Sequence, residues 1–305
     1  MKRMSLLIVG TVAFDAVETP HGKVPRMLGG AATYAAVAAS YFASVRLVAV
    51  VGEDYTSRDH SIFRGRPIDT RGLERVAGRS FFWSGKYSQD MNDRTTLDTQ
   101  LNVLAEFDPK LPLEYRDSPF VFLGNIQPSL QLRVLHQLRR KPRLVALDTM
   151  NYWIEGALSD LRAVLRHVHV LLINDSEARQ LSGRHNLLQA AARIQAMGPK
   201  AVVIKRGEHG ATLFRGPHIF VAPGLPLHRV CDPTGAGDSF AGGFMGSLTA
   251  SGKIDDLSLR RAMIHGSVMG SFAVEKFGLE RLRRLTRKQI HARAKKFHHI
   301  TRFTL

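Results

Sequence analysis

The sequence reads Asp232-Pro233-Thr234-Gly235-Ala236-Gly237-Asp238-Ser239-Phe240-Ala241-Gly242-Gly243-Phe244 between residues 232 and 244, and this stretch decides the fold. Gly235, Ala236 and Gly237 leave a loop with almost no side chain, and the small residues after Asp238 predict a helix. Free N–H groups at a helix start bind anions. Asp238 would repel an anion there unless it acts as a base that takes a proton from a hydroxyl, while the amides of residues 235–238 stabilise a phosphoryl group. The alternative is a tight turn with Asp238 as the helix N-cap.

Short apolar runs alternate with helix-compatible segments along the chain. β-branched runs of this length, separated by helices, predict βαβ units in a mostly parallel sheet with helices on both faces. The alanine-rich segment 31–43 predicts a helix packed closely on that sheet, because small side chains allow a short approach. The predicted strands are Leu6–Val9, Leu47–Val51, Phe120–Leu123, Leu144–Leu147, Val168–Ile173 and Ala201–Ile204.

Residues 80–104 break this alternation. The aromatic residues Phe81, Phe82 and Trp83 are followed by a polar stretch in which β-branched residues alternate with polar ones. This pattern predicts exposed antiparallel strands in a small sheet outside the main core. We interpret that sheet as a lid over a cleft, and an ordinary β excursion is the alternative.

The stretch from Asp232 to Phe244 resembles the second signature of the ribokinase, or PfkB, family of carbohydrate kinases. Residues 29–33, Gly-Gly-Ala-Ala-Thr, resemble the family's first signature, and similar motifs extend over nearly the whole chain. The resemblance implies a ribokinase-like α/β fold, with one domain over residues 1–305 and a β lid formed by roughly residues 11–35 and 80–104. It also implies that the chain is an ATP-dependent kinase that acts on a hydroxyl of a small sugar or sugar derivative.

Within that resemblance, Asp238 is the catalytic base, and Gly235, Ala236 and Gly237 form the anion hole. Pro233 stands where many members of the family have threonine, which we expect to alter the turn and not the chemistry.

The resemblance also implies ATP and Mg²⁺ as cofactors. Residues 174–177, Asn-Asp-Ser-Glu, look like the family's Asn-x-x-Glu motif, in which Glu177 organises the metal and its waters. A hard carboxylate and a neutral amide oxygen suit a Mg²⁺ that keeps most of its water shell. Helix capping by Asp175 or Ser176 is the alternative. Lys205 neutralises phosphate charge or else points to solvent. The positions implied on the nucleotide side are Asn174, Lys205, Gly207, Gly210, Thr234, Gly266 and Ser271.

The acceptor site is implied by a second group of residues. Asp15 falls where the family places an aspartate that holds substrate hydroxyls, and Gly29, Gly30 and Thr33 belong to the first signature. Asn125 and Asn151 follow strands, at the sheet edge where ligands bind in α/β folds, although turn and capping roles explain them equally well. Arg94 is expected to close over the substrate from the lid. Ala31 and Tyr34 replace a lysine and an asparagine of ribokinase itself, which puts ribose in doubt.

Three functions remain open at this point. The first is a sugar kinase, the second a nucleoside kinase whose aromatic lid residues stack a base, and the third a non-catalytic protein that binds nucleotide or nucleic acid. The presence of Asp238 and Glu177 disfavours the third. A P-loop NTPase is excluded because no Gly-x-x-x-x-Gly-Lys-Ser/Thr occurs, and Phe240 stands where a dinucleotide-binding motif needs its third glycine.

The composition bounds the partners and the location. The net charge of +17 attracts anions in general, and the basic residues concentrate in residues 279–305. We interpret that segment as a solvated helix face and do not expect nucleic-acid binding, since no recognition motif accompanies it. No apolar run is long enough to cross a membrane. The single cysteine, Cys231, excludes an intramolecular disulfide and predicts a reducing cytoplasm. A homodimer through the lid remains open.

Overall fold

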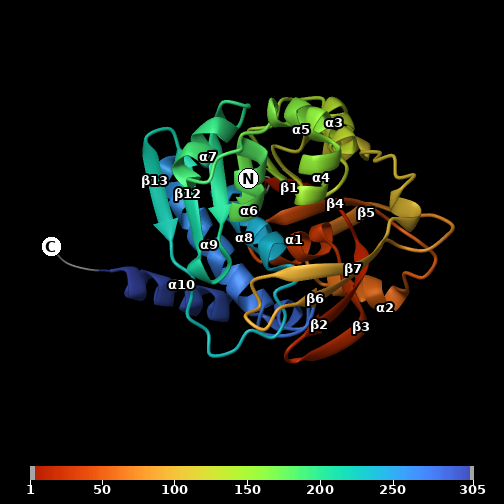
Figure 1. The fold of residues 1–305 in the computed structure, drawn as a ribbon. Helices are drawn as coiled ribbons and strands as arrows, with labels where there is room; N and C mark the ends of the chain where they lie inside the picture. The colour runs from red at the N-terminus through yellow and green to blue at the C-terminus, as the bar shows by residue number, and fades with distance from the viewer. Residues whose placement is uncertain (1–3, 303–305) are drawn as a thin grey trace.

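The computed structural model describes residues 4–302, which fold into a large nine-stranded sheet and a smaller four-stranded sheet (Figure 1). The large sheet has the strand order β13-β12-β11-β10-β9-β8-β1-β4-β5. All neighbouring strands from β11 to β5 pair in parallel, and β12 and β13 are antiparallel. Its strands are β1 (Ser5–Val9), β4 (Ser44–Val51), β5 (Ile68–Arg75), β8 (Phe120–Leu123), β9 (Leu144–Asp148), β10 (Val170–Asn174), β11 (Ala201–Lys205), β12 (Ala211–Arg215) and β13 (His218–Ala222).

Helices cover both faces of the large sheet, which confirms the predicted fold class. One face packs on α1, α8, α9 and α10, and the other on α3, α4, α5, α6 and α7. Side chains of β1 divide between the two cores, with Leu6 and Ile8 on the first face and Leu7 and Val9 on the second. The helices are α1 (Ala31–Ala39), α2 (Ser57–His60), α3 (Pro128–His136), α4 (Asn151–Gly156), α5 (Leu158–Leu165), α6 (Asp175–Ser182), α7 (Leu187–Gln195), α8 (Ala236–Ser251), α9 (Asp256–Ala273) and α10 (Arg287–Thr301).

Helix α8 is held tightly between two other helices. A Cβ at Gly242 would lie 2.3 Å from the carbonyl oxygen of Ala35 in α1, and a Cβ at Gly243 would lie 2.6 Å from that of His265 in α9. Only glycine allows such a close approach on both sides of the helix. The close contact made by the alanine-rich helix at Gly242 is with α8, whereas the prediction concerned its packing on the sheet, and α1 ends at Ala39 and not at Ala43.

The second sheet has the strand order β3-β2-β6-β7 and is formed by β2 (Ala13–Thr19), β3 (Gly22–Gly29), β6 (Phe82–Tyr87) and β7 (Arg94–Gln100). The pair of β6 and β7 is antiparallel, whereas β2 and β6 pair in parallel. Of the segment 11–35 assigned to the lid, residues 13–29 belong to this sheet. Residues 31–35 lie in α1, where their side chains are buried, and Ala32, Tyr34 and Ala35 pack into the main core.

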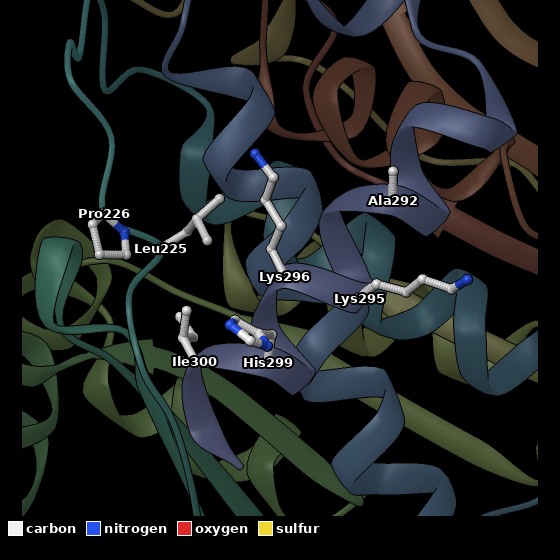
Figure 2. A pocket seen from close by; sticks show the side chains of 7 residues that line it. All are labelled: Leu225, Pro226, Ala292, Lys295, Lys296, His299 and Ile300. Carbon is white, nitrogen blue, oxygen red and sulfur yellow. The ribbon is translucent and has the colours of Figure 1, made fainter.

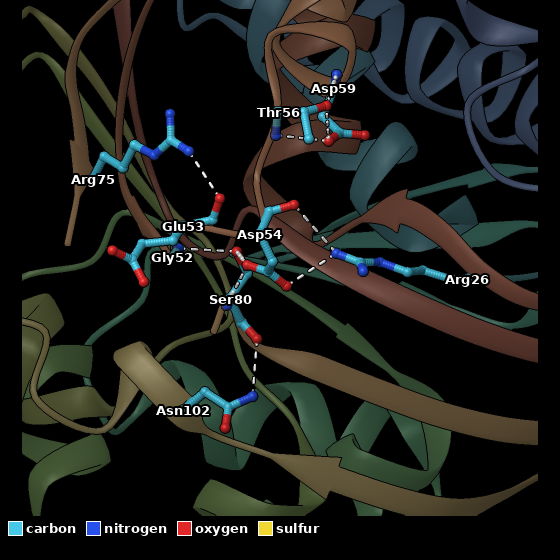
Figure 3. A network of polar contacts seen from close by, with 9 residues as sticks. All are labelled: Arg26, Gly52, Glu53, Asp54, Thr56, Asp59, Arg75, Ser80 and Asn102. Carbon is cyan, nitrogen blue, oxygen red and sulfur yellow. Dashed lines mark hydrogen bonds and ion pairs between the residues drawn. The ribbon is translucent and has the colours of Figure 1, made fainter. Parts of the chain in front are cut away.

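A polar network joins the second sheet to the end of β4 (Figure 3). The Asp54 carboxylate accepts hydrogen bonds from the backbone N–H and the hydroxyl of Ser80, at 2.8 and 2.7 Å, and from Arg26 at 2.9 Å. The carbonyl of Ser80 in turn accepts from Asn102. Asp54 thus ties the segment that leads into β6 and a side chain of β3 to the body of the protein.

Helix α10 carries the basic segment. Ile290 and Phe297 pack it onto the core, and a shallow groove separates its outer side from the loop at Leu225 and Pro226 (Figure 2). Among residues 4–302, none of the helices combines the length and the hydropathy that a bilayer crossing needs.

Candidate active site

The glycine loop leads directly into helix α8. Gly235 is the N-cap residue with φ of 74°, and α8 begins at Ala236, so Asp238 lies within its first turn. The helix therefore starts two residues before Asp238, and the interpretation of Asp238 as N-cap is wrong. The Ala236 N–H donates to the carbonyl of Pro233, whereas within residues 4–302 those of Gly235 and Gly237 find no acceptor. These two groups are free to bind an anion.

Two neighbours fix the conformation of the loop. The ring of Tyr34, which is 1% exposed, lies against Gly235, and a Cβ there would be 2.5 Å from three ring carbons. The Asp232 carboxylate has no exposed surface and accepts from the N–H groups of Thr234 and Gly278, both at 2.9 Å. Burial raises the pKa of Asp232. Asp232 therefore organises the loop and makes no contact with solvent.

Asp238 is partly exposed, so its carboxylate is accessible to a small molecule. Burial raises the pKa of its carboxyl to about 6, with a further contribution from the charge of Asp148, and Lys205 and Arg94 act in the opposite direction. A carboxyl with this pKa is mostly ionised at neutral pH and is basic enough to accept a proton from an alcohol as that alcohol reacts.

Lys205 and Asp148 form an ion pair beside the glycine loop. Nζ of Lys205 donates to Oδ2 of Asp148 at 2.8 Å, and both side chains are largely buried. A Cβ at Gly237 would lie 3.1 Å from the same Nζ. The structure therefore places the Lys205 ammonium at the glycine loop and not in solvent. Asp148 was not among the predicted site residues, and the only sequence signal was an acid that closes a buried apolar strand.

Asn174 and Glu177 form a capping box at the start of α6. The Glu177 N–H donates to Oδ1 of Asn174 at 2.8 Å, and Oε2 of Glu177 accepts from the Asn174 N–H at 3.0 Å. Neither Asp175 nor Ser176 is the N-cap, because Asn174 holds that place. Burial raises the pKa of Glu177 to about 7, with a contribution from Asp148. The motif thus combines a structural role with a buried carboxyl next to the Asp148–Lys205 pair.

Asp15 extends from β2 of the second sheet toward the same place. Its side chain is 5% exposed, and its pKa is raised to about 7, first by burial and then by the charges of Asp232 and Asp238. A Cβ at Gly29 would lie 1.9 Å from Oδ2 of Asp15, so any larger residue here would displace the Asp15 carboxylate. Gly30 has φ of 91° and closely approaches the Thr11 carbonyl. The double glycine therefore makes room for the Asp15 carboxylate.

Strands β6 and β7 bring aromatic and basic side chains to this face of the second sheet. Trp83 is the register partner of Asp15 on the neighbouring strand, so the two side chains lie on the same face. The Trp83 ring covers Gly85, and the Arg94 guanidinium lies 5.6 Å from the ring centroid. Tyr87 accepts a hydrogen bond from the Thr234 hydroxyl at 3.1 Å, which connects β6 to the glycine loop.

Comparison with known proteins assigns this arrangement to a family. The model of the pfkB family carbohydrate kinases matches residues 5–283. The chain belongs to this family.

Relatives of several kinds share this pfkB fold. The chain is 28% identical to a cytidine kinase of Thermococcus kodakarensis over 269 residues, which cover 85% of this chain and 95% of the relative. An inositol 3-kinase of Arabidopsis thaliana is 27% identical over 288 residues, covering 90% and 74% of the two chains. A nucleoside kinase of Burkholderia thailandensis, solved in complex with inosine, has a TM-score of 0.79 at 20% identity over 95% of this chain and 97% of its own. The protein is a kinase that transfers phosphate to a hydroxyl.

Some residues of this pfkB kinase that were predicted to bind the acceptor do not contact the cluster around Asp238. Asn125 is occupied by neighbours, since its Oδ1 accepts from Trp153 at 2.8 Å and its Nδ2 contacts Met150. Asn151 is exposed at the start of α4. Thr33 has no exposed surface, and its burial argues against direct contact with a substrate.

Some of the residues predicted to bind the nucleotide also have other roles in the structure. Gly207 has φ of 51° and lies in the turn after β11, and Gly210 is confined there by the carbonyl of Ala222, which would be 2.1 Å from a Cβ. Gly266 lies in the contact between α9 and α8, where a Cβ would be 2.9 Å from the Phe240 carbonyl. Ser271 donates to the carbonyl of Val268 and accepts from Arg293. Gly210 and Gly266 therefore have packing roles that explain these glycines without a ligand.

Proposed function

We propose that this pfkB kinase transfers the terminal phosphoryl group of ATP to a hydroxyl of a nucleoside. The observation that carries the proposal is the placement of Trp83 beside Asp15 on one face of the lid sheet. A carboxylate that accepts hydrogen bonds from sugar hydroxyls, next to an aromatic ring on which a base stacks, matches the two halves of a nucleoside. The cytidine kinase relative supports the same substrate class.

Asp238 is the general base in this proposal. Its carboxylate takes the proton of the acceptor hydroxyl as that oxygen forms a bond to the terminal phosphorus, and the bond from this phosphorus to the bridging oxygen breaks to release ADP. The N–H groups of Gly235 and Gly237 stabilise the charge on the transferred group, and the Lys205 ammonium adds a positive charge beside the glycine loop. These groups need no rearrangement, since Tyr34 and Asp232 hold the loop in place.

The residues around Glu177 fit a magnesium ion. Asp148, Glu177 and Asp238 bring three carboxyls near the positive charges of Lys205 and Arg94, and this excess of acid favours a cation. Within residues 4–302 no cluster of three or more acidic, histidine or cysteine side chains is arranged to hold a metal directly. That is the situation expected of Mg²⁺, which binds through few protein oxygens, its own waters and substrate phosphates. We infer that Glu177 and Asn174 hold such an ion, which neutralises phosphate charge when bound.

A polyol such as inositol is the second candidate acceptor, favoured by the match to inositol 3-kinases. The two candidates differ in their dependence on Trp83, because a polyol has no base to stack.

The test is a phosphorylation screen with Mg-ATP against nucleosides, free pentoses and hexoses, and inositols. The proposal expects turnover of one or more nucleosides, and a Trp83→Ala variant should raise KM for the nucleoside about tenfold or more, which is the size of one stacking contact. Turnover of a sugar or inositol alone, with unchanged KM in Trp83→Ala, would refute the nucleoside assignment.

A further inference from the structure

Three adjacent strands of the large sheet end in polar side chains that contact one another or lie close together. Asp148 ends β9, Asn174 ends β10 and Lys205 ends β11. The Asp148–Lys205 pair therefore reaches across the end of β10, with Asn174 as the register partner of Lys205.

Both carboxylate oxygens of Asp148 are engaged. Oδ2 accepts from Lys205 at 2.8 Å, and Oδ1 accepts from the backbone N–H of Thr149 at 2.9 Å. The side chain is 7% exposed. Asp148 does not cap α4, because the N-cap residue of that helix is Met150. The backbone at the end of β9 thus fixes the orientation of the Asp148 carboxylate, and its side-chain partner is the Lys205 ammonium group.

Lys205 depends on this partner for both its position and its charge. A lysine has four rotatable methylene carbons and a single charged atom, so its head group is placed only by what it contacts. Burial lowers the pKa of Lys205, but Asp148 first and then Glu177 and Asp238 outweigh burial, and the pKa is raised overall. The ammonium that results lies next to Gly237, one residue before the proposed base.

We propose that Asp148 is a positioning residue that holds the Lys205 ammonium at Gly237, where it meets the terminal phosphate of ATP. The inference rests on the proposed function and extends it to a residue outside the glycine loop. Asp148 then acts through Lys205 and does not touch the transferred group.

The direction in which nucleotide affinity changes when Asp148 is neutralised separates a positioning role from a simple electrostatic one. Asp148 is an acid near a site for phosphate, so if it did nothing but add negative charge, neutralising it would tighten nucleotide binding. If it positions Lys205, neutralising it releases the ammonium and weakens binding. The two readings predict opposite changes.

The experiment measures binding of a non-hydrolysable ATP analogue with Mg²⁺ by calorimetry to the wild type, Asp148→Asn, Lys205→Met and the double variant. We expect each single change to weaken binding about tenfold or more, as for loss of a buried charge-assisted contact, and the double variant to be no weaker than Lys205→Met. Asp117→Asn, which removes a carboxylate paired with Arg139 at the surface, is the matched control and should leave binding unchanged.

Tighter binding by Asp148→Asn, or two effects that multiply in the double variant, would overturn the proposal. Thermal melting of each variant shows whether it is folded, and Asp148→Glu, which keeps the charge, should restore part of the affinity if the first variant melts early. The binding measurements need no acceptor, so they stand even where the nucleoside screen fails. In the active enzyme the same variants should lower kcat and leave KM for the acceptor nearly unchanged.

Discussion

A single methyl group at Gly235 is expected to destabilise the protein and to abolish the geometry of the glycine loop. Gly235 has φ of 74°, a conformation that costs an L-residue about 1–2 kcal/mol. The new Cβ would also lie 2.5 Å from three carbons of the buried Tyr34 ring, and overpacking of this kind costs roughly 1–3 kcal/mol. Together these effects predict a loss of about 2–5 kcal/mol in Gly235→Ala, or roughly 5–15 °C in melting temperature for a protein of this size.

Gly237→Ala is the matched variant. Gly237 lies in α8 without a positive φ, and its nearest neighbour is the flexible end of Lys205 at 3.1 Å. Its melting temperature should stay within about 2 °C of the wild type, because the lysine can move and alanine favours a helix. The kinase activity of Gly237→Ala should nevertheless fall, since the methyl group displaces the Lys205 ammonium from the place where we propose that the terminal phosphate binds. Calorimetric melting and initial rates on both variants provide the assay, and equal stability of the two variants would refute the reasoning.

Three further predictions concern charged residues. Asp238→Asn should lower kcat about 10²-fold or more with nucleotide affinity largely retained, measured by steady-state kinetics and calorimetry. Because Asp238 must be ionised and its pKa is about 6, kcat/KM should fall about tenfold per pH unit below that value, and a flat profile down to pH 5 would contradict its role as base. The pKa of Asp15 is about 7 in the folded protein, so its negative charge opposes folding fully above pH 7 and not at all below about pH 4. Asp15→Asn should therefore raise the melting temperature at pH 8 and leave it unchanged at pH 4.

The lid sheet offers a separate measurement. Substrate should protect residues 80–104 from hydrogen exchange, because a ligand between Asp15 and Asp238 would tie the lid strands to the body. Unchanged exchange in this segment on adding ATP and acceptor would count against closure of the lid.

The main parallel strands could be predicted from sequence because a strand buried on both faces is a continuous apolar run. Leu6–Val9, Phe120–Leu123 and Ala201–Ile204 agree with β1, β8 and β11 to within one residue at each end. Strands β5, β12 and β13 were missed, since polar residues such as Arg71, Thr212 and His218 interrupt the apolar pattern toward the two edges of the sheet. Helix α1 was predicted too long because nothing in the sequence of residues 40–43 shows that the chain turns there.

The site was predicted in part for similar reasons. The glycine loop is a local feature, and its residues are contiguous, so Gly235 and Asp238 could be singled out. Asp148 and Lys205 lie 57 positions apart, and only the pairing of β9, β10 and β11 brings them together. The raised pKa of Asp15, caused first by burial and then by the charges of Asp232 and Asp238, likewise depends on tertiary structure that brings distant parts of the chain together.

The close fit of α8 between α1 and α9 has a consequence for how such an enzyme diversifies. Gly242 and Gly243 leave no space on either side, so these two positions of the helix that carries Asp238 tolerate almost no larger residue. Strand β7, by contrast, is solvent-accessible along its whole length. If β7 lines the acceptor site as proposed, exchange of its residues between relatives should alter acceptor selectivity and leave the packing of α8 unchanged.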